Sequence, residues 1–382
     1  MELRKFVAPE ILFGNGSREL AARYAVNFGG RKVLVVTDEG VINAGWVDPL
    51  LRDLQAANLA YTVFSDVSPN PRDFQVSAGA EVFLRENCNL IIAIGGGSPM
   101  DCAKGIGIAS YNHRSVLDFE GVDEVPIPGP PLICIPTTAG SAADVSQFAI
   151  INDSRRKVKI AVISKTVVPD VALIDPTTTL TKDAYLTACT GIDALTHAFE
   201  AYVSNASSSI TDLHALEAIR LTWNTLPLLM KDLKNIELRN EMMKACMHAG
   251  LAFSNASLGV VHAMAHSLGG YLDLPHGECN ALLLEYAVEY NFDQSPTRFR
   301  NIAQAIGIQT DGLSLAQLRE QIVSAIHAFR YQVGINRSLH EIGVSLNDLL
   351  ILANKAIDDP CVATNPKKLN IQNIEEIYGK AF

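Results

Sequence analysis

The sequence of 382 residues lacks the patterns that mark several specialised classes of protein. No apolar run approaches the roughly 20 residues that a membrane-spanning helix needs, so we expect no membrane partner. The opening MELRKFVAPEIL contains no apolar signal region, which argues against secretion. The seven cysteines are scattered and form no CxxC pair. This cysteine usage predicts reduced thiols and a cytoplasmic location.

Clustered positive charge is also missing. Lys and Arg number 31 against 41 Asp and Glu, a formal net charge of −10, so we expect no nucleic-acid partner. The short basic run RRK at 155–157 is best explained as a solvated turn. Repeats and low-complexity segments are absent, and 48% hydrophobic residues with 19% charged ones indicate a globular chain of two or three domains.

The first half of the chain alternates short apolar segments with helical stretches. The apolar segments do not alternate with polar residues, which is typical of strands buried on both faces of a parallel sheet. We therefore predict an α/β domain with a Rossmann-like parallel sheet over residues 1–181. The expected strands lie at 32–37, 61–64, 90–94, 131–135 and within 170–180.

From Lys182 onward the pattern is almost entirely helical, as in ITDLHALEAIRLTWNTLPLLM at 210–230. A block of strands followed by a block of helices indicates a separate second domain. We predict an all-helical domain over residues 182–382.

Three marked segments follow predicted strands: Asp38, the GGGSPMD segment at 95–101 and the PTTAGS segment at 136–141. Ligands of parallel sheets bind at the carboxyl ends of the strands. Glycines between a strand and a helix allow a diphosphate to approach the backbone, and the helix N-terminus faces its charge. The glycines can also be explained by close packing alone. Asp38 can be explained either as a ligand of a ribose or as the N-cap of a helix. The usual GxGxxG fingerprint is absent.

Acidic and imidazole side chains gather in the second half. Asp193 and His197 are spaced i, i+4 in a helical run, so they project from one face. His262 and His266 share the same spacing, and His276 follows between Pro275 and Gly277. Three imidazoles and one carboxylate suit Fe²⁺ or Zn²⁺ better than Ca²⁺ or Mg²⁺. We predict a metal site with the ligands Asp193, His197, His262 and His276, although His266 lies on the same helix face as His262. A structural role is the alternative for any one of these histidines.

The segments GIDALTHAFEAY, HAMAHSLGG and LPHGECNALLL resemble the signatures of the iron-containing (group III) alcohol dehydrogenases, and the resemblance extends over essentially the whole chain. It implies a dehydroquinate synthase-like architecture, with a nucleotide-binding domain followed by a helical metal-binding domain. It also implies that Asp193, His197, His262 and His276 hold the metal, while His266 lies beside it.

The same resemblance implies which residues contact NAD. It assigns Asp38 to the ribose, with a preference for NAD over NADP, and the GGGSxxD segment to the pyrophosphate. PTTAGS differs from the family's PTTAGT only in Ser141, which keeps the hydroxyl. The implied cofactor-binding residues are Asp38, Asn70, Gly95, Gly96, Gly97, Ser98, Asp101, Thr137, Thr138, Ser141 and Lys159.

The implied reaction is reversible hydride transfer between a short alcohol or aldehyde and NAD(H), with iron, or zinc, acting as a Lewis acid. Phe253 and Cys361 match family positions that line the substrate pocket. His266 is the candidate for proton transfer because imidazole titrates near neutrality. A homodimer is the family expectation. Two related enzymes fit the sequence less well. Dehydroquinate synthase should have a Glu where this chain has Asp193. Glycerol dehydrogenase usually lacks the four-ligand pattern that His197 completes here. A regulatory protein on this scaffold remains the alternative function.

Overall fold

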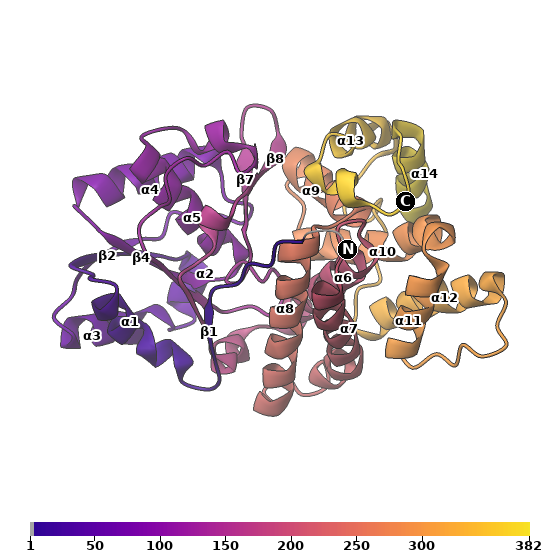
Figure 1. Ribbon diagram of the computed structural model, residues 1–382, viewed down its shortest axis with the longest axis horizontal. Coiled ribbons are helices and arrows are strands. Elements are labelled where there is room, and N and C mark those ends of the chain that lie inside the picture. Colours follow the sequence, from indigo (N-terminus) through magenta and orange to yellow (C-terminus); the bar gives the residue numbers. More distant parts are fainter. Residues whose placement is uncertain (1–3) are drawn as a thin grey trace. The chain divides into compact units, whose positions relative to one another are not determined.

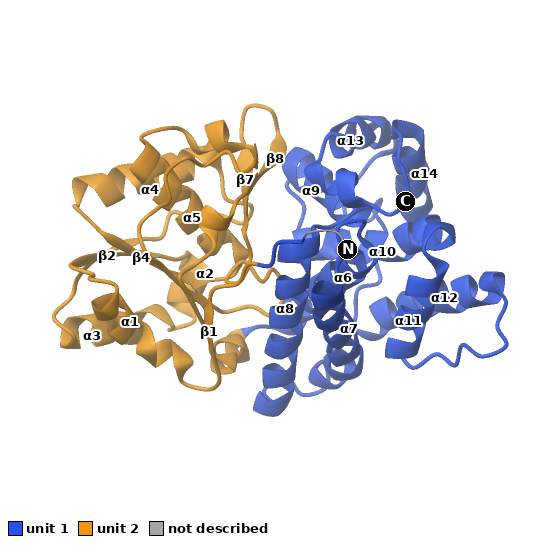
Figure 2. Ribbon diagram, viewed as in Figure 1, with its two compact units in different colours: residues 1–6, 182–382 blue, residues 7–181 orange. Residues whose placement is uncertain are grey.

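The computed structural model describes residues 4–382 and divides the chain into two compact units (Figures 1 and 2). One unit is Val7–Thr181. The other is Lys182–Phe382 together with residues 4–6.

The unit 7–181 is built around a six-stranded sheet in which every pairing is parallel. The strand order is β1-β9-β6-β4-β2-β3. These strands are β1 (Glu10–Phe13), β2 (Lys32–Val36), β3 (Ala60–Phe64), β4 (Leu90–Gly95), β6 (Leu132–Pro136) and β9 (Val171–Ile174).

Both faces of this sheet are buried. Val33 and Val35 of β2 belong to one apolar cluster, whereas Leu34 and Val36 belong to another. Neighbouring residues of a strand point to opposite faces, so each cluster covers one side. Because both faces are buried, the strands are apolar at every position instead of at alternate positions. The predicted parallel α/β sheet is confirmed.

Short helices cover the two faces and connect the strands. They are α1 (Ala21–Asn27), α2 (Glu39–Asn43), α3 (Val47–Ala56), α4 (Asp73–Arg85) and α5 (Gly97–Asn112), with the 3₁₀ turns η1 (Ser17–Leu20), η2 (Val116–Phe119), η3 (Lys165–Val167) and η4 (Pro176–Thr181).

A smaller sheet, of order β5-β8-β7, completes this unit. It comprises β5 (Gly121–Val122), β7 (Phe148–Asp153) and β8 (Val158–Ile163), and β7 pairs with β8 in antiparallel fashion. Neither this hairpin nor β1 was predicted from the sequence. The basic run at 155–157 forms the hairpin's exposed turn, as a solvated turn requires.

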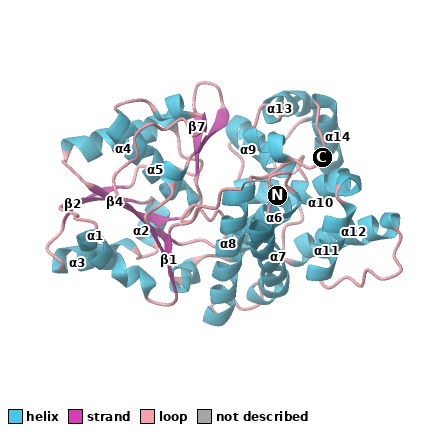
Figure 3. Cartoon of the chain, viewed as in Figure 1, coloured by secondary structure: helices cyan, strands magenta, loops and turns pink. Residues whose placement is uncertain are grey.

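Helices alone form the described part of the other unit from Lys182 onward, which confirms the helical prediction (Figure 3). They are α6 (Ala184–Val203), α7 (Ser209–Leu229), α8 (Ile236–Ala256), α9 (Val260–Leu272), α10 (His276–Asn291), α11 (Pro296–Ala305), α12 (Leu315–Gln332), α13 (Leu349–Ala356) and α14 (Ile371–Ala381), with the 3₁₀ turns η5 (Phe292–Gln294), η6 (Leu346–Asp348) and η7 (Pro360–Thr364). None of the helices in the described range 4–382 is long and apolar enough to cross a bilayer.

The centre of the helical unit is α6, which is buried along most of its length. Helix α10 begins directly against it. A Cβ atom at Gly277 would lie 2.6 Å from the carbonyl oxygen of Cys189, so only glycine allows this approach. The close contact brings the first residue of α10, His276, to the face of α6 that carries Asp193.

Candidate metal centre and nucleotide site

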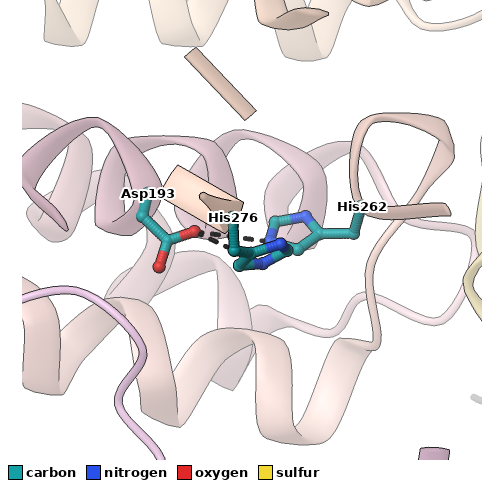
Figure 4. A group of neighbouring side chains, drawn as sticks. All are labelled: Asp193, His262 and His276. Carbon is teal, nitrogen blue, oxygen red and sulfur yellow. Dashed lines mark ion pairs between the residues drawn. The ribbon is translucent and has the colours of Figure 1, made fainter. Parts of the chain in front are cut away.

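Three of the four predicted ligands converge on one point inside the helical unit (Figure 4). Asp193 comes from α6, His262 from α9 and His276 from the start of α10. The Oδ1 atom of Asp193 lies 3.8 Å from Nε2 of His262 and 3.7 Å from Nε2 of His276. Asp193 and His262 are buried, and the side chain of His276 is 25% exposed.

The spacing of these atoms fits a transition-metal ion. Two donors that each lie about 2.1 Å from an ion stand roughly 3.0–3.8 Å apart at ordinary coordination angles. One carboxylate and two imidazoles are also the donor types that Fe²⁺ and Zn²⁺ accept. The residues present therefore fit the metal that the sequence predicted.

Charge in this group is arranged for a cation. Burial by itself would raise the pKa of Asp193, but the neighbouring His197, His262 and His276 hold it far below its usual value. Burial also opposes charge on His262, yet the carboxylates of Asp193 and Glu200 raise its pKa to about 9. A divalent ion among these residues would replace the bound proton and satisfy the same carboxylates.

His197, the fourth predicted ligand, lies beside the converging atoms and is not one of them. Its ring stacks on the ring of His262, with centroids 4.5 Å apart, and on Phe253, at 4.3 Å. The imidazole is buried, and among the neighbouring groups it has the largest electrostatic effect that lowers the pKa of Asp193. Its role as a ligand stays a prediction.

Two residues that the sequence analysis missed complete the surroundings. Glu200 accepts a hydrogen bond at 2.6 Å from Nδ1 of His262, which turns Nε2 toward Asp193. The amide Nδ2 of Asn280 lies 2.7 Å from Oδ1 of Asp193 and 3.2 Å from Nε2 of His262 and of His276. Helical spacing was the available signal, because Glu200 follows Asp193 at i+7 and His197 at i+3, and Asn280 follows His276 at i+4.

His266, the predicted proton carrier, lies next to the group without entering it. Its ring stacks on that of His276, with centroids 5.3 Å apart. Its Nδ1 atom lies 2.8 Å from Oδ2 of Asp359, a third residue that sequence reasoning missed. Cys361 belongs to the same cluster, so the two predicted pocket residues, Phe253 and Cys361, both lie beside predicted site histidines. Whether they contact substrate stays a prediction.

In the unit 7–181, most of the predicted cofactor residues lie where strands of the six-stranded sheet end. Asp38 follows β2, Asn70 follows β3, the glycine segment ends β4, and the segment 137–141 follows β6. Strands β4 and β6 are neighbours, and the amide of Thr137 donates to the carbonyl of Gly95 at 2.8 Å. The chain runs from β2 to β3 on one side and then to β4 on the other, so the β2/β4 boundary is the topological switch point where such sheets bind nucleotides.

The glycine segment begins a 16-residue helix, with Gly96 as the N-cap of α5 and Gly97 and Ser98 in its first turn. A Cβ atom at Gly97 would lie 3.0 Å from Cβ and Oγ of Ser141, and one at Gly96 would lie 3.3 Å from Thr138. The backbone of one loop therefore packs against side chains of the other at the N-terminus of α5. A phosphate group at this N-terminus stays a prediction.

The remaining cofactor residues are less uniform. Asp38 does cap α2, since its Oδ1 accepts from the amide of Val41 at 2.9 Å, and its contact with a ribose stays a prediction. Asn70 has a left-handed backbone, with φ of 55°. Lys159 lies on β8, close enough to Asp101 for its charge to lower that residue's pKa. Burial outweighs this effect and the larger lowering effect of Lys104, and it raises the pKa of Asp101 to about 6.

Comparison with known proteins agrees with the geometry. Residues 8–176 match the family described as iron-containing alcohol dehydrogenase, and residues 187–382 match the C-terminal part of the Fe-containing alcohol dehydrogenase family. The 1,3-propanediol dehydrogenase of Citrobacter freundii is 40% identical over 380 residues, which cover 99% of this chain and 98% of that protein. The NAD-dependent methanol dehydrogenase of Bacillus methanolicus is 36% identical over 377 residues, 99% of each protein. A crystal structure of 1,3-propanediol oxidoreductase superposes with a TM-score of 0.96 at 38% identity and 100% coverage of both chains.

The chain belongs to the iron-containing alcohol dehydrogenase family. It is an alcohol dehydrogenase, an oxidoreductase of class EC 1.1.1, and the predictions of family, fold and activity are confirmed. These relatives are named as enzymes, so a purely regulatory role is not favoured.

Proposed function

We propose that the protein transfers a hydride reversibly between a short-chain alcohol or aldehyde and NAD(H), with Fe²⁺ held by Asp193, His197, His262 and His276. The convergence of Asp193, His262 and His276 within 4.8 Å carries the proposal. His197 is included because the family resemblance assigns it as a ligand and because its ring lies against that of His262, beside the converging atoms. Zn²⁺ is the alternative ion, since it accepts the same donors.

The ion, when bound, acts as a Lewis acid on the hydroxyl or carbonyl oxygen of the substrate. The chain's own residues supply the rest. Asp193 stays anionic and balances the charge of the site, while Glu200 holds the tautomer of His262. His266, oriented by Asp359, carries the substrate proton through Nε2. The buried ring of Phe253 keeps water from this side of the group.

The nucleotide is expected at the β2/β4 edge of the sheet. The amides of Gly97 and Ser98 at the start of α5 bind the pyrophosphate, and the side chains of Thr137 and Thr138 contact the same region. The oxygen of Asp38 that does not cap α2 accepts from the ribose hydroxyls and disfavours a 2′-phosphate. A relative of full length is named as NAD-dependent, which supports this preference.

The test is metal analysis of anaerobically purified protein, followed by absorbance assays of NADH formation with a panel of short alcohols. We expect about one equivalent of iron per chain and activity with NAD that exceeds activity with NADP. Fully loaded protein that forms no NADH with any alcohol, and consumes none with the matching aldehydes, would refute the proposed reaction.

We also propose a cytoplasmic homodimer. All seven cysteines are free thiols, and all are buried, which suits a reducing compartment. Light scattering of the purified protein measures the number of chains directly.

A further inference from the structure

We propose that His266, Asp359 and Cys361 form a second metal site, which takes a thiophilic divalent ion such as Zn²⁺ or Cd²⁺. Potential ligand atoms of these three side chains all lie within 4.8 Å of one another. His266 comes from α9, Cys361 from η7 and Asp359 from the N-cap position of η7. The two side chains of the His266–Asp359 pair are each only 7% exposed, and Cys361 is buried.

Sulfur sets this cluster apart from the first one. In the described residues, these are the two groups in which three side chains of ligand type come together, and the group of Asp193 contains no cysteine. A thiolate, an imidazole and a carboxylate together form a donor set that Zn²⁺ accepts readily. Softer ions such as Cd²⁺ gain most from the thiolate. The two clusters are therefore expected to differ in ion preference.

The backbone holds this donor set in place. Oδ1 of Asp359 accepts from the amide of Cys361 at 2.8 Å, while Oδ2 receives Nδ1 of His266 at 2.8 Å. The carboxylate is thus fixed by the turn η7, and the other two donors are arranged around it. Donors of one tetrahedral ion stand roughly 3.3–3.7 Å apart, so the imidazole and carboxylate must separate by about half an ångström.

A hydrogen-bonded network without an ion is the competing explanation. In that network Asp359 accepts from the imidazole N–H and from the thiol. Burial and the charge of Asp359 raise the pKa of the Cys361 thiol well above its usual value, so the sulfur stays protonated until an ion displaces the proton. Ion binding must therefore release the thiol proton, and the proton on Nδ1 of His266 must leave that nitrogen for Nε2 or for solvent.

Occupancy of the site has a consequence for catalysis, and this consequence rests on the proposed role of His266. An ion on Nδ1 replaces the hydrogen bond to Asp359 and places positive charge on the imidazole that carries the substrate proton. Excess thiophilic metal is then expected to inhibit the loaded enzyme.

The decisive experiment measures binding without turnover. Cd²⁺ is titrated into protein whose first site has been loaded, and the sulfur-to-metal charge-transfer band is followed in the ultraviolet. We expect one further equivalent with this band, lost in Cys361→Ala and in Cys361→Ser. Cys246→Ala, a buried cysteine on α8, is the matched control that keeps the band. Asp359→Asn should weaken the added equivalent by about 10-fold to 100-fold.

The first site is tested separately by His276→Ala, which should lose the first equivalent and keep the charge-transfer band. A band that survives Cys361→Ala, or its absence from the unaltered protein, overturns the second site and leaves the hydrogen-bonded network. The band is measured without NAD, alcohol or turnover. A failure of the proposed reaction therefore leaves this result unchanged, and a failure of the second site leaves the proposed reaction untouched.

Discussion

Oε2 of Glu200 lies 2.6 Å from Nδ1 of His262, and Oε1 of the same carboxylate accepts from the amide of Val261 at 2.7 Å. One buried side chain thereby satisfies the N-terminus of α9 and fixes the ring of a predicted metal ligand. Because Nδ1 is directed at Glu200, Nε2 is the nitrogen that faces Asp193. A carboxylate behind a ligating histidine also strengthens the ligand as a base.

Glu200→Gln should therefore weaken metal binding by about 10-fold to 100-fold while leaving the protein folded. The amide removes the charge and retains the shape of the side chain. Equilibrium dialysis against Fe²⁺ under anaerobic conditions measures the dissociation constant. Glu217→Gln on α7 is the control, since this partly exposed carboxylate pairs with Arg220 and lies outside the group. Equal affinity in the Glu200 variant and the control would show that orientation of His262 does not need the charge.

Periodicity made part of this arrangement predictable. Residues that lie on one face of one helix can be grouped from spacing alone, as Asp193 and His197 were, and Glu200 shares that face at i+7. Strands buried on both faces reveal themselves by unbroken apolar runs, as in β2 and β4.

Contacts across long separations could not be read in this way. Asp359 meets His266 from 93 residues along the chain, and nothing local to DDPC marks it as an imidazole partner. The stacking of His197 on Phe253 depends on how α6 and α8 pack. The strand β1 is short, lies at the edge of the sheet and is only half-buried, so its apolar pattern is weak.

Cofactor preference can be separated from helix capping at Asp38. Asp38→Asn keeps a side chain that caps α2 and removes the charge that disfavours a 2′-phosphate. Like charges placed together cost several kcal/mol, so the ratio of kcat/KM for NAD over NADP should fall by roughly 10-fold to 100-fold. Asp38→Gly should relax the preference equally and also lower the Tm. An unchanged ratio in both variants would remove Asp38 from the cofactor site.

The pyrophosphate loop is tested at Gly97. A Cβ atom there would lie 3.0 Å from Ser141, so a larger side chain blocks the approach of the loop and of any phosphate. Overpacking costs roughly 1–3 kcal/mol, and Gly97→Val should raise the Kd for NADH by roughly 10-fold to 100-fold. The metal content should stay unchanged, because the predicted ligands belong to the helical unit.

Gly379→Ala in α14 is the control, since a Cβ atom there meets nothing within 4 Å. Normal NADH binding by the valine variant, measured by fluorescence titration, contradicts the loop assignment.

A pair of histidines on α7 and α8 gives the fold a pH dependence of its own. The Nδ1 atoms of His214 and His248 lie 2.9 Å apart. Burial is the largest cause that lowers the pKa of both, and His248 lowers the pKa of His214 further. At His248, Glu217 opposes the effect of burial and Lys244 adds a smaller lowering effect. Below a pH of about 6.5 the unfolded chain binds protons that the folded pair does not, so stability is lost as the pH falls.

His248→Gln should therefore reduce the difference in unfolding free energy between pH 7.5 and pH 5.5, as measured by urea titration at both values. His340→Gln, at an exposed histidine, serves as the comparison. A variant that loses as much stability on acidification as the unaltered protein would show that the pair is not the group responsible.

The two histidines one turn apart on α9 should behave differently when each is replaced. The Nε2 atom of His262 faces Asp193, whereas Nδ1 of His266 is turned to Asp359. His262→Ala should therefore lose metal and activity together. His266→Ala should keep the metal and lose turnover by about 100-fold, the size expected for a general acid–base group. Metal stoichiometry and kcat are measured on both variants, prepared anaerobically in the same way. A metal-free His266 variant beside a fully loaded His262 variant would exchange the two roles. Loss of metal from both variants would instead indicate that the stacked rings of His266 and His276 stabilise the ligand set as one unit. The orientation of His276 would then depend on its packing against His266.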